Sequence, residues 1–463
     1  MAILATFTVL GRSSLSASQA VQPDNPLQRA EALVAKGELR EAEREYRRAI
    51  ERDPRSPLAR RGLARVLLWR LRVDEAEALF TELLRENPNN LDAREGVATI
   101  AYWRGDSATA ARELRTILQA DPARESARAL LRAIEEAFDP RYGVEASVLD
   151  DDQPLRRSTA RIDGSGMFGD AVRLEGTALV ESFEREAATD ETFALEVAAE
   201  TYLRSLQSRV AAHLKPFRFP NGDTALLGGA SLSRRHVRSQ STIAFGTRRD
   251  EILETAAALD SQATVRRAFL SWTMDRSDGW LAGANVERLD YFDQNEGFGA
   301  NGYLLAPIHR TGETSAWAGL GGAYRDTDEA RFRLVRFHSE PRSGGGFLYR
   351  YEGVYDPYWT PHDLREARAI LVAERRQGPW SAKIQIDAGI AQDEAIGFGP
   401  AAGTTPLPPA IAPVLFARNF HPWRVSTSIS RMLGSLQLEL VYERNVTVFY
   451  TSNEYQARLA RRF

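Results

Sequence analysis

The segment WSAKIQIDAGIA (380–391) decides the fold of the larger part of this chain, because its residues alternate between apolar and polar. The apolar set falls on every second position: Ala382, Ile384, Ile386, Ala388 and Ile390. The positions between them include Lys383, Gln385 and Asp387. Successive side chains of a β-strand point to opposite faces of the sheet, so the pattern predicts a strand with one apolar and one charged face.

The same alternation recurs, in blocks separated by polar turns, throughout the residues that follow Phe138. Three further examples are TFALEVAAET (192–201), RRAFLSWTMD (266–275) and SLQLELVYER (435–444). Soluble sandwiches of sheets alternate too, but these blocks are ten or more residues long, whereas soluble strands mostly have about 5–6 residues. Aromatic residues gather near the block ends, and charges recur on the polar face, as in barrels with a water-filled lumen. At roughly 20 residues per strand and connection, residues 139–463 predict an antiparallel transmembrane β-barrel of about 16 strands.

The first third of the chain carries a different signal, a repeat with a period of 34 residues. Its three copies are AEREYRRAIERDP (42–54), AEALFTELLRENP (76–88) and AARELRTILQADP (110–122). In each copy a small Ala lets two helices approach closely, a large apolar residue fills the groove between them, and Pro ends the second helix. These repeats resemble the tetratricopeptide repeat. They predict a short α-solenoid of three repeats over residues 21–138, with a capping helix at 125–138. The chain as a whole is therefore expected to be an α + β multidomain protein.

The resemblance implies a concave face lined by the first helix of each pair. It places five residues there: Arg61, Arg65, Trp69, Tyr102 and Trp103. Stacking rings and forked guanidinium donors suit a peptide or a sugar, so this face is a candidate platform for a periplasmic protein or glycan. The alternative is that Trp69 and Trp103, again 34 residues apart, serve only packing between repeats.

Composition and motifs exclude several classes of function. The net charge of −3 gives no electrostatic reason to expect nucleic acid as a partner. The absence of cysteine excludes disulfides and cysteine-ligated metals. No HExxH, GxSxG or Walker motif is present, so neither enzyme activity nor a cofactor or metal is expected.

The N-terminal residues predict export. The apolar run AILATFTVL (2–10) is followed by ASQA (17–20), which has the small residues that precede a signal-peptide cleavage site. Residues 1–20 are therefore expected to be a signal peptide. No later run of about 18 apolar residues predicts a transmembrane helix.

The sequence EYQARLARRF (454–463) continues the alternation and resembles the C-terminal assembly signal of outer-membrane barrels. Tyr455, Leu459 and Phe463 occupy the matching positions, whereas Arg461 departs from the usual apolar or aromatic residue. The resemblance implies that the barrel assembly machinery recognises this strand and that the strand closes the barrel.

A tetratricopeptide module joined to such a barrel resembles the exopolysaccharide-export group. Its members include the cellulose-synthase outer-membrane subunit, the poly-N-acetylglucosamine exporter and the YaiO-type barrels. The segment YDPYWTPHDLREARAILVAER (355–375) resembles the aromatic-Ser/Thr-Pro stretch of these barrels, with Tyr355, Tyr358 and Trp359 at the aromatic positions. Three repeats in place of a long solenoid favour the YaiO-type branch. The resemblance implies a Gram-negative outer-membrane protein with its N-terminal domain in the periplasm and a part in exopolysaccharide export.

Several alternatives stay open at this point. After Phe138 the chain has 38 basic and 42 acidic residues, which favours a neutral or cationic polymer over a strongly anionic one. The cluster of Tyr355, Tyr358 and Trp359 either stacks on sugar or anchors the barrel at the membrane interface. The Gly- and Pro-rich segment 397–413 is either a long outer loop or a lumen plug. The alternative to transport is a non-conducting scaffold barrel whose repeats dock periplasmic partners, and a barrel enzyme ranks last.

Overall fold

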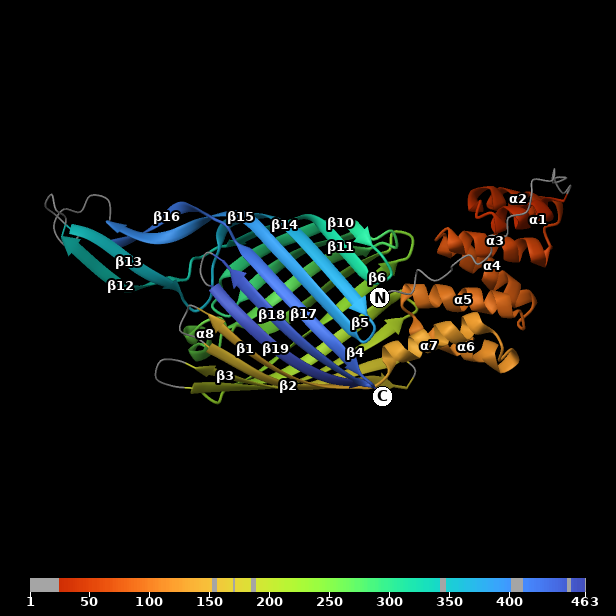
Figure 1. The fold of residues 1–463 in the computed structure, drawn as a ribbon. Coiled ribbons are helices and arrows are strands. Elements are labelled where there is room, and N and C mark those ends of the chain that lie inside the picture. Colours follow the sequence, from red (N-terminus) through yellow and green to blue (C-terminus); the bar gives the residue numbers. More distant parts are fainter. Residues whose placement is uncertain are drawn as a thin grey trace.

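The chain folds into a row of helices followed by a closed sheet (Figure 1). The computed structural model describes residues 25–151, 156–169, 171–184, 189–341, 347–400, 411–447 and 451–462. The expected signal peptide (1–20) and Phe463 lie outside these residues. None of the described helices is long and apolar enough to cross a membrane.

The helical part confirms the predicted solenoid of tetratricopeptide repeats. Its helices are α1 (Pro26–Ala35), α2 (Leu39–Arg52), α3 (Pro57–Trp69), α4 (Val73–Glu86), α5 (Leu91–Arg104), α6 (Ser107–Ala120) and α7 (Glu125–Phe138). Side-chain caps begin several of them: Asn25 accepts from the Leu27 N–H and Asn90 from the Ala93 N–H. Consecutive helices pack on each other along the row, so each repeat buries its apolar face against its neighbours.

A large ring set against a glycine fixes the register between repeats. Tyr46 lies so close to Gly62 that a Cβ added there would come within 2.2 Å of the Tyr46 ring. Phe80 and Gly96, each 34 residues later, repeat the contact at 2.4 Å. Both rings are buried. The ring therefore occupies the volume that a side chain on the next helix would need.

The substitution Gly96→Leu is expected to destabilise the solenoid by about 2–3 kcal/mol, because it overpacks a site filled by Phe80. The third repeat suggests the rescue, since it has Leu114 at the ring position and Leu130 at the glycine position. The double variant Phe80→Leu, Gly96→Leu should therefore recover much of the loss. Thermal unfolding of the full chain, followed by helical circular dichroism, measures both, and an unchanged melting curve for Gly96→Leu contradicts the prediction.

The second part is a closed antiparallel sheet, and the prediction of about 16 strands is confirmed. The ring consists of β1 (Arg141–Asp151), β2 (Arg156–Phe168), β3 (Val172–Glu184), β4 (Thr189–Leu203), β5 (Ser208–Arg218), β6 (Thr224–His236), β7 (Ser241–Glu251), β8 (Thr264–Asp275), β9 (Leu281–Tyr291), β10 (Glu296–Arg310), β11 (Thr314–Thr327), β14 (His362–Gln377), β15 (Trp380–Pro400), β17 (Trp423–Leu433), β18 (Leu436–Val446) and β19 (Thr451–Arg462). β19 pairs with both β18 and β1, so the last strand closes the barrel as expected.

Three elements lie outside this ring. β12 (Phe332–Pro341) and β13 (Phe347–Tyr355) pair with each other as a separate hairpin. β16 (Ile411–Phe420) pairs with the far half of β15, whose near half pairs with β17. The short helix α8 (Ala256–Asp260) lies in the connection between β7 and β8.

The two ends of the barrel differ in their connections. At the end next to the helices the strands join by short turns, such as 204–207, 237–240 and 434–435. The opposite end, here named the distal end, has α8, the β12–β13 hairpin and the extension of β15 and β16 (Figure 1). Outer-membrane barrels have short turns at one end and longer loops at the other, and this barrel has the same asymmetry.

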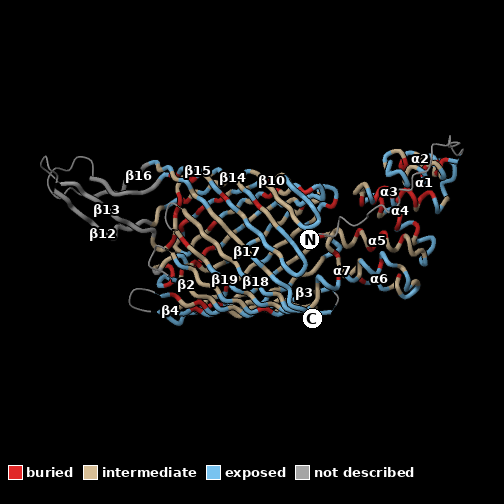
Figure 2. The backbone as a smooth tube through the Cα atoms, in the orientation of Figure 1, coloured by how far each residue is buried: buried red, intermediate tan, exposed pale blue. Residues whose placement is uncertain are grey.

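The alternation predicted from sequence corresponds to the two faces of this barrel. Large apolar residues of the outer face are strongly exposed, including Val197 at 61%, Leu270 at 50% and Ile390 at 64% (Figure 2). Their neighbours along each strand face the interior and are mostly polar or charged. An apolar exterior around a polar interior is the arrangement of transmembrane β-barrels.

Candidate functional site

The inner face of the barrel is lined by charged side chains that are matched along strands and across neighbouring strands. Arg458 of β19 donates to Glu145 of β1 at 2.9 Å and to Asp163 of β2 at 2.8 Å, across the line where the barrel closes. Arg424 of β17 donates to Asp387 of β15 at 2.9 Å. Further pairs are Arg267 with Asp250 and Glu287, Arg368 with Glu366, and Lys383 with Glu374. Within the described strands these paired charges form no single-sign ring that would select strongly for ions of one charge.

A hollow of about 460 Å³ lies on this wall where β10, β11, β14, β15 and β17 adjoin. Its polar lining includes Asn301, Arg325, Arg368, Gln385, Asp387 and Arg424. The ring of Tyr303 lies in the same hollow and is 41% exposed. Tyr303 faces Gly283 on β9 and Gly321 on β11, and a Cβ added at Gly283 would come within 2.6 Å of the ring. Gly283 therefore leaves room for the ring against the wall, while part of the ring stays exposed in the hollow.

The sequence interpretation missed Tyr303. A signal was available, because glycines are frequent on the strands beside it, as in GLGG (319–322). Glycine in a strand interior often marks the close approach of another group. Only the pairing of β9, β10 and β11 shows that the approaching group is an aromatic ring on the inner face.

The distal end of the barrel is narrowed by the loop between β7 and β8, residues 252–263. Leu259 of this loop packs against Phe183 of β3. Leu253 packs against Phe183 and against the cluster that contains Phe217 of β5. The loop therefore reaches from its own strands across to strands on another part of the ring, inside the mouth of the barrel.

A second segment, residues 357–361, meets this loop. Thr255 Oγ1 donates to the carbonyl oxygen of Pro357 at 2.5 Å. Tyr358 is 1% exposed, belongs to the apolar cluster formed with the first loop, and stacks on Tyr291 of β9 with ring centroids 4.1 Å apart. The two segments together form a layer at the mouth that we name the distal shelf.

A polar contact holds the shelf to the rim of the barrel. The Tyr358 hydroxyl donates to Asp293 Oδ1 at 2.8 Å, and Arg331 Nε donates to Asp293 Oδ2 at 2.5 Å. The Arg331 backbone N–H donates to Thr360 Oγ1 at 2.9 Å, which adds a link to the same segment. Burial alone would raise the pKa of Asp293, but the hydrogen bonds from Arg331, Tyr358 and the Asn295 backbone outweigh it and hold the pKa below its usual range. Asp293 is therefore an ionised carboxylate at neutral pH.

The three aromatic residues singled out from sequence do not form one lipid-facing cluster. Tyr358 is buried in the shelf, and the Trp359 ring lies 5.8 Å from the guanidinium of Arg325, which faces the lumen. Tyr355 ends β13, and its side chain lies outside the described residues. The interpretation of Tyr358 as a membrane-interface anchor is wrong, because the shelf covers its ring.

The segment 397–413, an outer loop or a lumen plug by its sequence, extends β15 and β16 in its described part. Residues 397–400 belong to β15 and 411–413 to β16, which extend at the distal end, while 401–410 lie outside the described residues. The part of the described chain that narrows the mouth is the distal shelf.

The residues predicted for the concave face of the repeats differ in their surroundings. The Arg65 guanidinium lies 5.1 Å from the centre of the Trp69 ring, and Trp69 remains 40% exposed. Arg61 donates to Asp92 of α5 at 2.7 Å. Trp103 packs against the first apolar cluster of the solenoid and Tyr102 against the second. Trp69 thus keeps a face available to a partner, whereas Trp103 is engaged in packing.

Trp103 packs in the part of the solenoid that meets the barrel. The apolar cluster that it joins also contains Val237 from the turn between β6 and β7. Asp106, which is buried, accepts from the Thr109 N–H at the start of α6 and from Arg204 Nε of the turn between β4 and β5, both at 3.0 Å. The solenoid is therefore held against two turns at the end of the barrel opposite the distal end.

The junction gives a second prediction. Asp106→Asn keeps a good helix cap but removes the charge that Arg204 needs, whereas Asp106→Ala removes both and should cost the solenoid about 1 kcal/mol through the cap alone. Both variants should speed proteolytic release of the helices from the detergent-solubilised chain, and only Asp106→Ala should also lower the helical melting temperature. Arg204→Gln is the matched control and should behave like Asp106→Asn. Equal resistance of all variants and the parent protein to protease would contradict the predicted role.

The C-terminal strand has the expected orientation. Tyr455 and Leu459 of β19 face outward, with 56% and 40% exposure. Whether the assembly machinery reads this strand stays a prediction.

Comparisons with known proteins agree with this description. Residues 27–90 and 72–134 each match a tetratricopeptide repeat family. No curated protein matches the sequence. Among solved structures, one described as a bacterial polysaccharide outer membrane secretin is 12% identical and has a TM-score of 0.48, with 70% of this chain and 98% of that chain covered.

Two other structures resemble parts of the chain. CdiB from Acinetobacter baumannii is 8% identical over 70% of this chain and 60% of its own, with a TM-score of 0.39. The TPR domain of Arabidopsis OM64 is 17% identical over 24% of this chain and 93% of its own, with a TM-score of 0.24. At these identities and TM-scores the likenesses say nothing about what this chain binds or transports. The chain is a tetratricopeptide-repeat module joined to a 16-stranded outer-membrane-type β-barrel.

Proposed function

We propose that this protein carries a neutral or weakly charged saccharide polymer across the outer membrane. The observation that carries the proposal is the Tyr303 ring, which packs against Gly283 and remains 41% exposed in a hollow lined by amides and charged side chains. Aromatic rings offer an apolar face that can cover the apolar face of a sugar, while nearby polar groups bond its hydroxyls. The hollow combines both features on one wall of the lumen.

The charges of the lumen support a neutral cargo. Arg458 and Arg424 are each matched by carboxylates on neighbouring strands, so neither is a free cation for a polyanion. A pore that guides a strongly anionic polymer would be expected to have an excess of basic rings. The cargo is therefore a polymer whose recognition relies on stacking and hydrogen bonds.

The solenoid supports a role that begins in the periplasm. It is held at the end of the barrel with short turns through Asp106 and Arg204, so a partner on its concave face would lie near the entrance. Trp69, stacked under Arg65, is the ring on that face most open to such a partner. We propose that this face receives a periplasmic protein or the glycan itself.

The test measures how strongly neutral oligosaccharides block the ion current through the barrel in a planar bilayer. The barrel used for this test has shelf residues 252–263 replaced by a short turn. Block of this shelf-free barrel is expected, with much weaker block when it also has Tyr303→Ala and retained block with Tyr303→Phe, which keeps the ring. Tyr324→Ala, on the outer face of β11, is the control and should leave block unchanged. Equal block of Tyr303→Ala and the parent would overturn the role of the hollow.

A second function is favoured by the distal shelf. Two loops that meet inside the mouth suit a barrel that does not conduct and serves instead as a membrane scaffold for the solenoid. This alternative predicts a silent bilayer even after the shelf has been removed. A current from the shelf-free barrel rejects it.

A further inference from the structure

Two arginines face each other on the outer side of the barrel near its distal end. Arg249 of β7 lies directly opposite Arg266 of β8, and both side chains are exposed. Like charges directly opposite each other on antiparallel strands repel. Arg249 donates to Thr264 Oγ1 at 3.2 Å. Within the described ranges, neither guanidinium has a carboxylate at ion-pair distance.

The nearest carboxylates along this row are already engaged. Asp290 lies opposite Arg266 on the other side, and Glu296 lies opposite Asp290. Both accept from Arg288, at 3.0 and 2.8 Å. In this row Arg288 is therefore paired with two carboxylates, whereas Arg249 and Arg266 have no carboxylate partner among the described residues.

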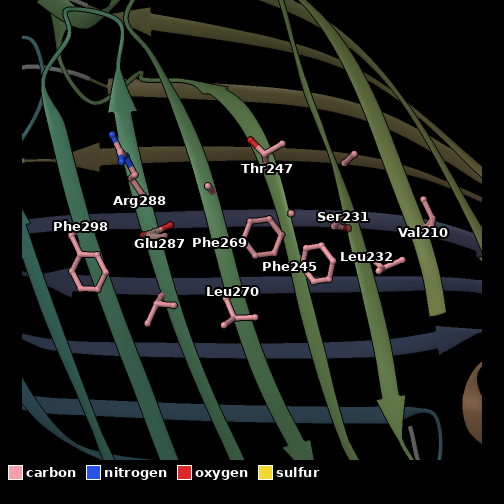
Figure 3. Close-up of a pocket in the computed structure, with 14 residues that line it drawn as sticks. Val210, Ser231, Leu232, Phe245, Thr247, Phe269, Leu270, Glu287, Arg288 and Phe298 are labelled. Atoms are coloured by element: carbon pink, nitrogen blue, oxygen red, sulfur yellow. The ribbon is translucent and has the colours of Figure 1, made fainter. Parts of the chain in front are cut away.

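An apolar groove begins directly below the arginine pair. Its volume is about 800 Å³. The next outward-facing residues toward the middle of the barrel are Thr247 and Ala268, which are small, and beyond them lie Phe245 and Leu270 (Figure 3). Leu232, Val286 and Phe298 complete the apolar lining, and Arg288 lies at the distal edge of the groove.

Small residues open the groove toward the pair. Gly228 lies opposite Arg249 on β6, so no side chain fills the space beside the guanidinium. Ala230 and Ala268 flank Thr247 in the next row. The surface thus has a cationic head region and an apolar channel that runs from it along the lipid-facing wall.

We infer that this surface binds a phosphorylated glycolipid of the outer leaflet, the lipid A part of lipopolysaccharide. Its phosphate bridges Arg249 and Arg266, whose planar donors match phosphate oxygens, and this anion relieves their repulsion. An acyl chain of the same lipid occupies the groove between Ala268 and Phe245. The inference rests on the distal end being the outer surface of the membrane, and it does not depend on transport through the lumen.

The charge of the pair gives the first test, which is the binding of purified lipid A to the full chain in detergent. The double variant Arg249→Gln, Arg266→Gln is expected to weaken binding at least about tenfold, which corresponds to about 1.4 kcal/mol. Arg365→Gln removes an exposed arginine from the outer face of β14, where Asp363 accepts from it, and should leave binding unchanged. Heat-modifiable migration on gels confirms that each variant is folded.

The groove gives an independent test. Ala268→Phe fills the channel while leaving Arg249 and Arg266 in the chain, and it should also weaken lipid A binding, whereas Ala369→Phe on the outer face of β14 should not. Lipid A binding by the double arginine variant at the parent level would overturn the inference, as would equal losses with Arg365→Gln. Equal affinity of the parent protein for cardiolipin would overturn the assignment to a glycolipid. Ion current through the barrel should be the same in all these variants.

Discussion

Replacing residues 252–263 by a short Gly-Ser turn is expected to raise the single-channel conductance of the barrel severalfold. Barrels of 16 strands leave an aqueous channel when nothing fills their interior. Here the loop spans part of the mouth, with Leu259 on Phe183 of β3 and Thr255 bonded to Pro357. Its removal takes away half of the distal shelf and leaves the 16 strands of the ring in place. Steady, large current steps in a planar bilayer are the expected readout.

The matched control removes a different distal element. Replacing residues 332–355 by a short turn deletes the β12–β13 hairpin, whose strands pair only with each other among the described strands. Arg331 and Asp356 lie next to each other at its base, so this deletion leaves the shelf attached. The hairpin variant should conduct like the parent protein. If both deletions, or neither, open the barrel, the shelf is not the element that closes it.

The architecture was predictable from sequence because the membrane imposes it. A spanning sheet must place apolar side chains outward and satisfy all of its backbone hydrogen bonds by closing. The segment 380–391 shows this alternation without any knowledge of its neighbours, and Ile390 is indeed strongly exposed on the outer face. The sequence signal for the 34-residue repeat was equally local, because Ala42 and its equivalents recur wherever two helices must approach each other.

The shelf was not predictable in the same way. Whether a loop turns into the lumen or away from it depends on residues far apart in the chain, here Leu259 with Phe183 and Thr255 with Pro357. The composition of 397–413 indicates either an outer loop or a plug, since Gly and Pro mark irregular segments, but composition does not give the direction in which a loop folds. Tyr358 stands out in the sequence because it belongs to the aromatic-Ser/Thr-Pro stretch. Only the fold shows that its ring stacks on Tyr291.

The concave face of the repeats shows the same limit of prediction from sequence. Trp69 and Trp103 are equivalent by sequence offset, yet Trp69 is exposed and Trp103 is packed. The difference arises outside the repeat, because the cluster around Trp103 includes Val237 of the barrel. A repeat pattern predicts equivalent positions, and docking to a second domain makes them inequivalent.

The variant Asp293→Asn is expected to loosen the shelf at neutral pH and to raise the frequency of open events in the bilayer. Asp293 accepts from both Tyr358 and Arg331, and a neutral amide loses the ion pair and one of the two acceptor oxygens. The remaining link through Thr360 holds the segment less firmly. The expected result is an intermediate conductance phenotype, weaker than deletion of 252–263 because the apolar packing of the shelf stays intact.

The pH dependence distinguishes this mechanism from a general loss of stability. The pKa of Asp293 is lower in the folded protein than its unfolded value of about 3.9. The stability that its ion pair gives the shelf is therefore complete above about pH 3.9 and is lost as the pH falls through the lower folded pKa. The parent barrel should therefore stay closed from about pH 8 to pH 5 and open only in stronger acid, whereas Asp293→Asn should open without this acid dependence. Asp278→Asn breaks a similar contact with Arg276 at the end of the barrel next to the helices and should leave the acid opening unchanged. An identical pH profile for Asp293→Asn and the parent protein would show that the shelf is held by its apolar contacts alone.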